Sequence, residues 1–437
     1  MWNGRLRVFD AAILPLLIRQ EEWQIAGFLP ICATLYFCLE DQALRKAVQF
    51  GAGNIGRGFT GQLFSESGFE VVFVDVVPEL VRMLNERRSY PIRIACENPW
   101  TVTVKNVRAV DGRDIKAVAD EICTATLMCT AVGVNVLPKV APTIAEGIKA
   151  RADADVIEPI NIIICENLQN MAEFLKGEVK KHLPEQYHDY LEDKVGFVES
   201  VVGRMVPVMT EEQKAEDPLL VVVEPYKHLP ISKAGIKGNF PEIAGIELAD
   251  NFQSFVDRKL YTHNAGHAVA AYLGYLRGYH YVYQAMNDAQ INTTVRAAMT
   301  ETGEALIKKY GLDPSEHQAH IEDLISRFGN VALGDQVSRV GGDPLRKLGP
   351  NDRLVGGAKL CLEYGVFPTN LCKAIAAALR FDPPGDPTAP KVQTMVRELG
   401  IAGALREISG LSEDSEITRE VVRQYESVVE EFRRNPE

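Results

Sequence analysis

Residues 259–267, KLYTHNAGH, place a lysine, an asparagine and two histidines immediately before the apolar run AVAAYLGYL. On an ideal helix, Lys259, His267 and Asn264 project at about 0°, 80° and 140° and therefore share one arc. A lysine kept from water beside a cationic cofactor has a lowered pKa and can take a proton from an alcohol near neutral pH. The Asn264 amide can donate to an oxygen that gains negative charge, and His267 can bind a substrate hydroxyl or orient the other groups. His263 points elsewhere and is given no role.

Alone, this stretch is typical of a helix that opens with solvated polar residues, but CENLQN at 165–170 changes the interpretation. Asn167 follows the apolar run INIII, so we expect it at the C-terminal edge of a sheet, where α/β proteins bind ligands. Asn167 and Asn264 can together donate to a developing oxyanion. A metal ion can polarise a carbonyl equally well, but the sequence presents no cluster of ligands for one. The predicted catalytic residues are therefore Lys259, Asn167 and Asn264, without a metal.

Such a base needs a hydride acceptor, and FGAGNIGRGF at 50–59 indicates one. Its glycines stand in GxGxxG spacing after a predicted strand and at the start of a predicted helix, the context of a dinucleotide-binding turn. The first glycine allows the tight turn, the second lets the backbone approach a pyrophosphate, and the third lets helix pack on strand. The phosphates would meet free N–H groups at the helix N-terminus. The predicted cofactor-binding residues of this turn are Gly51, Gly53, Asn54, Ile55 and Gly56.

Asp75 predicts which dinucleotide binds. It lies at the end of the second predicted strand, 19 residues after Gly56. A carboxylate there accepts hydrogen bonds from the adenosine ribose and repels a 2′-phosphate, so NAD is favoured over NADP. CTAVG at 129–133 follows another predicted strand, and Gly133 is expected to allow close approach at the same edge. A plain strand-to-helix turn explains Gly133 nearly as well.

The elements that must position these groups are short β-branched and aromatic runs that alternate with helical stretches. The expected strands are KAVQF, VVFVDV, TVTVKNVRAV, ATLMCTAV and INIIIC, at 46–50, 71–76, 101–110, 125–132 and 160–165. This alternation predicts an α/β fold with an N-terminal, Rossmann-type, doubly wound parallel sheet. LLVVVEP at 219–225 either extends the sheet or leads out of it. From about residue 251 helical periods dominate, so a C-terminal, mainly α-helical domain is expected.

The domain boundaries follow from composition. HLPISKAGIKGNFPEIAG at 228–245 is rich in Gly and Pro and is predicted to be a loop that marks the domain change. We expect an NAD-binding domain with an extension at 46–245 and a helical catalytic and substrate-binding domain at 246–437. The ligand cleft is expected between the two.

Residues 1–45 do not share this pattern and are interpreted as a leader of unknown role, expected to be poorly ordered. The apolar run at 26–39 is shorter than the ~20 residues of a membrane helix and contains Pro30. A targeting segment and a structural part of the fold stay open as alternatives.

The composition of the 437 residues excludes several classes of function. A formal net charge of −12 argues against a nucleic-acid-binding surface, so an anionic substrate would need a local basic pocket. The eight cysteines show no CxxC pair and are expected to be buried free thiols of a reducing compartment, which favours the cytoplasm. We expect no stable membrane insertion, and a monomer or a small homo-oligomer.

Several motifs together resemble the polyol-specific long-chain dehydrogenase/reductase family: KAVQFGAGNIGRGF, VVFVDV, CENL, VEP, KLYTHNAGHAVAAYLG, DPLRKLGPNDRLVG and LEYG. The resemblance extends from about residue 46 to the C-terminus, and its K-x4-N-x2-H signature is highly specific. GAGNIGRGF favours the branch that acts on sugar phosphates over the free-polyol branch. The resemblance implies reversible, NAD-dependent interconversion of D-mannitol 1-phosphate and D-fructose 6-phosphate without a catalytic metal.

The resemblance also implies roles for single residues. Lys259 becomes the general acid/base, and Asn167 and Asn264 become the oxyanion site. Without the resemblance, the stretch RVGGDPLRKL, which contains Arg339 and Lys347, is typical of a basic turn between helices. Arg346 and Arg353 are further candidates for contact with a phosphate. The residues implied to bind substrate are His267, Arg339 and Lys347.

Two departures from the family pattern concern the substrate. The family usually carries an aspartate where Gly203 precedes Arg204, and many phosphate-specific members carry an arginine where Gly342 stands. A related polyol or hexonate dehydrogenase, such as a mannitol 2-dehydrogenase or a fructuronate reductase, is therefore the alternative. A non-catalytic NAD-binding redox sensor is a remote one.

Overall fold

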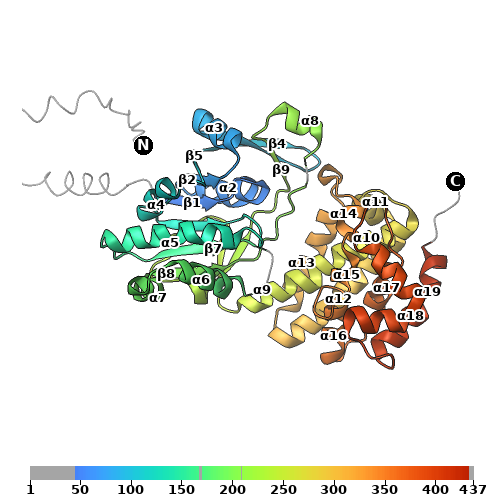
Figure 1. The fold of residues 1–437 in the computed structure, drawn as a ribbon. Helices are drawn as coiled ribbons and strands as arrows, with labels where there is room; N and C mark the ends of the chain where they lie inside the picture. Colours follow the sequence, from blue (N-terminus) through green and yellow to red (C-terminus); the bar gives the residue numbers. More distant parts are fainter. Residues whose placement is uncertain (1–44, 167–169, 208, 433–437) are drawn as a thin grey trace, which may run out of the picture. The chain divides into compact units, whose positions relative to one another are not determined.

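The computed structural model describes residues 45–166, 170–207 and 209–432. From Lys46 onward the chain forms one compact unit (Figure 1). The predicted leader, apart from Arg45, lies outside the described residues.

A parallel sheet of six strands dominates the first part of this unit, with the order β5-β2-β1-β6-β7-β8 within the described residues. The order reverses between β1 and β6, which is the switch point of a doubly wound fold. The expected Rossmann-type sheet is thereby confirmed. Its strands are β1 (Lys46–Phe50), β2 (Glu70–Asp75), β5 (Val107–Asp111), β6 (Leu127–Thr130), β7 (Ile160–Ile164) and β8 (Val195–Glu199).

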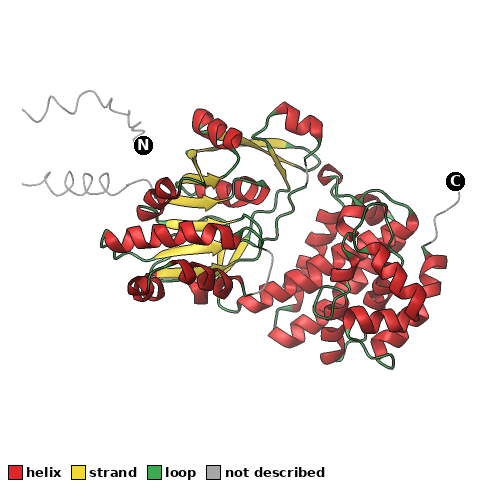
Figure 2. Ribbon diagram, in the orientation of Figure 1, coloured by secondary structure: helices red, strands yellow, loops and turns green. Residues whose placement is uncertain are grey.

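Helices cover both faces of the sheet, as Figure 2 shows. Alternate strand residues therefore enter different cores: Val71 and Phe73 belong to one cluster, Val72 and Val74 to the other. Burial on both faces explains why these strands are continuous apolar runs. The helices are the π-helical turn η2 (Gly56–Thr60), α2 (Gly61–Glu66), α3 (Pro78–Arg87), α4 (Ile115–Cys123), α5 (Leu137–Asp153), α6 (Met171–His182), the 3₁₀ turn η3 (Glu185–Tyr187) and α7 (His188–Lys194).

Two smaller sheets correct the sequence-based expectations. The single strand expected at 101–110 is wrong: Asn106 has a φ of +54° and separates β4 (Trp100–Lys105) from β5. β4 pairs with β3 (Ser89–Ile94), which also pairs with β9 (Val221–Val223), so the VVV run extends a separate sheet.

The loop expected at 228–245 is also not all loop. It contains β10 (Leu229–Ser232), which pairs in parallel with β11 (Ile246–Ala249), and the 3₁₀ turn η4 (Lys233–Gly235). Its apolar residues Leu229 and Ile231 are fully buried, which explains why a Gly- and Pro-rich segment holds a strand. The short helix α8 (Glu211–Glu216) precedes β9.

The second part is helical, as expected, and has its own apolar core. The apolar run at 268–286 does not form one helix, because the chain breaks at Gly278, whose φ is +82°. The helices are α9 (Phe252–Arg258), the π-helical turn η5 (Lys259–Asn264), α10 (Ala265–Arg277), α11 (Val282–Asn287), α12 (Ala289–Tyr310), α13 (Pro314–Phe328), the 3₁₀ turn η6 (Val331–Leu333), α14 (Val337–Gly341), α15 (Pro344–Lys347), α16 (Val355–Glu363), α17 (Thr369–Ala378), α18 (Ala389–Ser409) and α19 (Glu416–Glu431).

Two other properties bear on the expectations. Across the described ranges, no helix is both long and apolar enough to cross a membrane. The cysteines are not all buried as expected, because Cys96 and Cys123 are half-buried, whereas Cys129, Cys165, Cys361 and Cys372 are buried. Cys32 and Cys38 lie outside the described residues.

Candidate active site

KLYTHN forms the π-helical turn η5 between α9 and α10. The stretch therefore lies inside a continuous helical segment, and the expectation that it begins a helix is wrong. The helix begins earlier, after Asn251, because the half-buried residues of α9 continue the apolar periodicity toward the N-terminus. A π-turn pairs residues five apart and is frequent at functional sites. Lys259 and Asn264 are five residues apart, so both lie near the same face of the helical segment.

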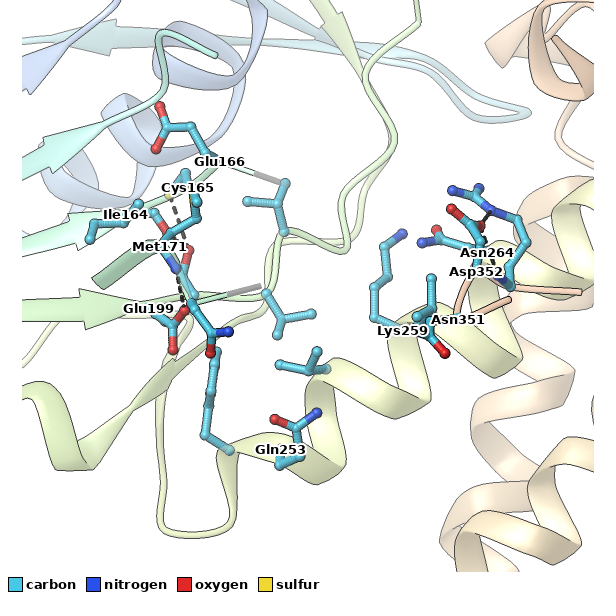
Figure 3. Close-up of a pocket in the computed structure, with 18 of the residues that line it drawn as sticks. Ile164, Cys165, Glu166, Met171, Glu199, Gln253, Lys259, Asn264, Asn351 and Asp352 are labelled. Atoms are coloured by element: carbon cyan, nitrogen blue, oxygen red, sulfur yellow. Dashed lines mark hydrogen bonds and ion pairs between the residues drawn. The ribbon is translucent and has the colours of Figure 1, made fainter. Parts of the chain in front are cut away.

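That face lines a cavity of about 770 Å³, which is within the range of small-molecule sites. Figure 3 shows Lys259, Asn264, Asn351 and Asp352 on one side and Cys165 with Glu166 on the other. The cavity thus joins the C-terminal edge of the parallel sheet to the π-turn. Its lining residues are Ile55, Ile164, Cys165, Glu166, Asn170, Met171, Glu199, Ser200, Val201, Val202, Phe252, Gln253, Val256, Lys259, Leu260, Asn264, Arg346, Asn351, Asp352 and Arg353.

Lys259 has the electrostatics of a base. Burial lowers its pKa well below the ordinary value of a lysine, the charges of Arg327 and Arg353 lower it further, and Glu224 opposes them. Within the described residues, its Nζ makes no hydrogen bond or ion pair. The lowered pKa favours the neutral amine more than in an ordinary lysine, and the nitrogen is free to accept a proton from a ligand in the cavity.

The predicted oxyanion pair is described only in part. Asn264 lines the cavity, whereas Asn167 lies outside the described residues. Glu166, which precedes Asn167 in the sequence, accepts through its carboxylate from Thr130 Oγ1 at 2.6 Å and from Val132 N at 2.9 Å. These bonds tie the end of β7 to the end of β6. Sequence reasoning missed this role, although an acid directly after an apolar strand was the available signal.

His267 does not line the cavity, although the ideal-helix projection placed it with Lys259. Its ring stacks on Phe328 with centroids 4.7 Å apart, and its Nε2 lies 3.4 Å from Asp335 Oδ2. Burial lowers the pKa of His267, and Asp335 opposes that shift. His263, which had no predicted role, is buried against the same Phe328 ring. The contact of His267 with substrate therefore stays a prediction.

The basic stretch at 339–353 is divided between the cavity and its surroundings. Arg339 forms an ion pair with Asp335, and Lys347 Nζ donates to the Gly342 carbonyl. The cavity lining includes neither of these two predicted substrate-binding residues. It does include Arg346 and Arg353, the two further candidates for phosphate contact.

The glycine turn has the shape that a dinucleotide requires. Gly51 has a φ of +89°, and a Cβ there would lie 2.5 Å from the Ala131 carbonyl oxygen. A Cβ on Gly56 would lie 2.0 Å from the Gly51 oxygen, so this glycine lets the helix pack against the turn. A Cβ on Gly53 would meet nothing within 4 Å, which leaves the space above the helix N-terminus open. Helical backbone begins at Asn54 and continues through Ile55.

Asp75 and Gly133 flank this turn. Asp75 Oδ2 accepts from Ala52 N at 2.8 Å, and its Oδ1 accepts from Val77 N at 3.0 Å, so its carboxylate is fixed at the end of β2. Gly133 follows β6 with a φ of +88° and also has open space at its Cβ position. The residues present therefore fit a dinucleotide with its pyrophosphate at Gly53 and its ribose at Asp75.

The chain matches two models of known protein domains, one in each part of the molecule. Residues 45–245 match the mannitol dehydrogenase Rossmann domain, and residues 251–429 match the mannitol dehydrogenase C-terminal domain. The chain belongs to the mannitol dehydrogenase family.

Within the mannitol dehydrogenase family, one curated relative is the mannitol-1-phosphate 5-dehydrogenase of Anoxybacillus flavithermus. It is 44% identical over 380 residues, which cover 86% of this chain and 98% of that protein. Two solved structures share the mannitol dehydrogenase fold at 17% identity, each covering 90% of this chain and 94% of the other. They are the Pseudomonas fluorescens mannitol 2-dehydrogenase complex with NAD and D-mannitol, with a TM-score of 0.69, and a substrate-free D-sorbitol dehydrogenase, with a TM-score of 0.75.

In the part of the chain that the structure describes, no group of three or more His, Cys, Asp or Glu side chains is placed to hold a metal ion.

Proposed function

We propose that this chain is an NAD-dependent dehydrogenase that interconverts D-mannitol 1-phosphate and D-fructose 6-phosphate. The observation that carries the proposal is the π-turn, which presents Lys259 and Asn264 together to a cavity bounded by the sheet edge. The 44% identical relative named mannitol-1-phosphate 5-dehydrogenase supports the choice of substrate. NAD is supported by the open glycine turn and by the fixed carboxylate of Asp75.

In this proposal Lys259 takes the proton from the polyol hydroxyl at the carbon that is oxidised. Its lowered pKa favours the neutral form of the amine, which accepts that proton. As the C–O bond gains double-bond character, the amide of Asn264 donates a hydrogen bond to the oxygen. Bound NAD supplies the hydride acceptor at the sheet edge.

Asn167, which follows Glu166 in the sequence, is proposed as the second amide donor. In the reverse direction the protonated Lys259 returns its proton to the ketose oxygen. His267, Arg339 and Lys347 are proposed to bind or orient the substrate, as the family resemblance implies. Cofactor contacts are proposed for Gly51, Gly53, Asn54, Ile55, Gly56, Asp75 and Gly133.

The substrate is tested by comparing ketose reduction with purified protein. Oxidation of NADH is followed with fructose 6-phosphate, fructose and fructuronate, and the same panel is repeated with NADPH. We expect kcat/KM to be highest with NADH and fructose 6-phosphate. If fructose or fructuronate is reduced as efficiently, the proposed substrate is wrong, and if nothing is reduced although NADH binds, the chain is not this enzyme.

A further inference from the structure

The cavity contains an arginine whose guanidinium is held at one edge and free at the other. Arg353 donates its backbone N–H and its Nε to Asp352 Oδ1, at 2.7 and 2.8 Å. Its side chain is only 13% exposed, so it is fixed in the cavity wall. Its terminal Nη1 and Nη2 groups, however, have no hydrogen-bond partner among the described residues. A half-buried arginine with two uncommitted donor groups is suited to an anionic ligand.

The carboxylate that holds Arg353 is shared with a second arginine. Asp352 Oδ2 accepts from Arg346 Nη1 at 3.1 Å, and Arg346 also lines the cavity. Burial alone would raise the pKa of Asp352, but the nearby charge of Arg353 lowers it, so the carboxylate stays ionised. Asp352 thus orients both guanidinium groups without leaving its own charge unpaired.

Basic side chains gather around Asp352. Arg346 pairs with Asp343 and Asp352, and Arg353 pairs with Asp352. Burial, the largest cause, and the charges of Arg353 and Arg346 lower the pKa of Lys347 to about 8, against the opposing charges of Asp343 and Asp352. The two arginines therefore repel the Lys347 ammonium, although the whole chain carries a formal net charge of −12. An anion bound here would relieve that repulsion.

The position of Arg346 and Arg353 in the same cavity as Lys259 and Asn264 indicates the class of ligand. Figure 3 places Asp352 and Asn351 beside Asn264 and near Lys259, in the wall of the same cavity. A ligand oxidised or reduced at Lys259 can therefore reach the arginines only with another part of the same molecule. The free N–H donors of Arg353 in the same cavity wall fit a phosphomonoester, whose oxygens accept several hydrogen bonds at once.

We propose that Arg353, assisted by Arg346, is the phosphate-recognition site that distinguishes a ketose phosphate or polyol phosphate from the free sugar. This inference rests on the proposed function and assigns its substrate specificity to two residues that lie outside the catalytic π-turn. The phosphate oxygens accept from the Nη groups of Arg353, while Asp352 keeps the guanidinium plane in place. Phosphate recognition thereby does not require an arginine at the position of Gly342.

The test compares Arg353→Gln, Arg353→Lys and Arg346→Gln with the unaltered enzyme. Ketose reduction is measured at saturating NADH and at the pH optimum of each variant, with fructose 6-phosphate and with fructose. Inorganic phosphate is added as a competitor against the ketose. Arg397→Gln is the matched control, because Arg397 is an exposed arginine of α18 whose bond to Thr394 lies in the same helix. Thermal midpoints establish that each variant folds, and Arg346→Gln changes a side chain that is 53% exposed.

We expect Arg353→Gln to raise the KM for fructose 6-phosphate about 10- to 100-fold, the loss typical of a charge-assisted hydrogen bond. Turnover of fructose should change less than about 2-fold, and competition by inorganic phosphate should disappear. Arg353→Lys should retain more affinity for fructose 6-phosphate than Arg353→Gln, because a lysine keeps the positive charge but lacks the paired N–H donors of a guanidinium. Arg346→Gln should show a smaller effect in the same direction.

Two results would overturn the inference: unchanged phosphate competition in Arg353→Gln, or an equal loss with fructose and fructose 6-phosphate. The second result would assign Arg353 to a hydroxyl or to the fold. If the proposed function is wrong, the unaltered enzyme itself prefers fructose to fructose 6-phosphate, which distinguishes this outcome from failure of the inference. In that case competition between inorganic phosphate and fructose, and its loss in Arg353→Gln, still decides whether the anion site exists.

Discussion

Arg327 and Glu224 form a buried ion pair in which Nε and Nη2 of the arginine donate to the two carboxylate oxygens at 2.7 and 2.6 Å. Arg327 belongs to α13, whereas Glu224 directly follows β9, so the pair joins the helical part to the Rossmann part. The same Nη2 donates to the Gly203 carbonyl at 2.6 Å. A short distance along the helix, Phe328 packs on the rings of His263 and His267. The pair therefore lies next to the π-turn η5, which carries Lys259 and Asn264.

This pair should control the pH dependence of catalysis. Arg327 lowers the pKa of Lys259 and Glu224 raises it, so removing either one shifts that pKa in a known direction. Alcohol oxidation requires the neutral amine, and its rate therefore rises with pH through the pKa of Lys259. Arg327→Met should move this rise in kcat/KM to higher pH, and Glu224→Gln should move it to lower pH.

The measurement is the pH profile of polyol-phosphate oxidation for both variants and the unaltered enzyme. Breaking a buried pair by removing one partner costs about 3–5 kcal/mol, so thermal midpoints must accompany the profiles. A purely structural role would lower stability and leave the profile in place. Shifts of the same sign in both variants would contradict the electrostatic explanation.

Lys259→Met should abolish most turnover while leaving NADH binding nearly unchanged. Loss of a general base typically costs about 10²–10⁴-fold in rate. NADH binding, followed by fluorescence titration, checks that the cofactor site is intact. Near-native activity in this variant would mean that another group takes the proton.

The same substitution should also stabilise the protein at neutral pH. The folded-state pKa of Lys259 lies below its unfolded value, so the unfolded chain binds the proton more tightly and folding is penalised. That penalty is full below the folded pKa and vanishes above the unfolded value of about 10.4. Lys259→Met should therefore raise the Tm at pH 7, and the difference should shrink as the pH approaches 10. A Tm at pH 7 that falls below that of the unaltered protein would contradict the assignment of a buried, neutral amine.

Asp75 should determine the preference between NAD and NADP. Asp75→Asn removes the charge and keeps one side-chain oxygen, which can accept from either Ala52 N or Val77 N in place of the two carboxylate oxygens. It should improve kcat/KM with NADPH relative to NADH, because a 2′-phosphate is no longer repelled. Asp75→Ala also loses the two hydrogen bonds to the turn, so it should weaken discrimination and bind both cofactors less well. An unaltered preference in both variants would show that the acid is not at the ribose.

The sheet and its glycine turn could be predicted because their signals are local. No knowledge of distant residues is needed to recognise a β-branched run such as Val71–Val74 or the spacing of Gly51, Gly53 and Gly56. The break at Asn106 was missed because a left-handed asparagine inside a β-rich run leaves only a weak trace in the sequence.

The surroundings of the site depend on contacts between distant segments. The ideal-helix projection grouped His267 with Lys259, but a π-turn changes the angle between residues and leaves His267 outside the cavity lining. Arg327 and Glu224 are 103 residues apart, and no periodicity in either segment indicates that they pair. The domain boundaries at 45, 245 and 437 and the roles of the single site residues stay predictions.

Alanine substitutions at Gly51 and Gly53, in the cofactor turn, should have different effects: the first on stability and the second on NADH binding. Gly51→Ala places a Cβ 2.5 Å from the Ala131 oxygen at a φ of +89°, so it should cost about 1–3 kcal/mol of stability. Gly53→Ala meets no atom within 4 Å in the protein and should leave the Tm nearly unchanged. Its methyl group would instead enter the space assigned to the pyrophosphate, so the Kd for NADH should rise at least about 10-fold, consistent with the close approach that this glycine permits. Thermal melts and NADH titrations of the two variants check the contrast, and a Gly53→Ala protein that binds NADH normally would show that the pyrophosphate does not lie on this turn.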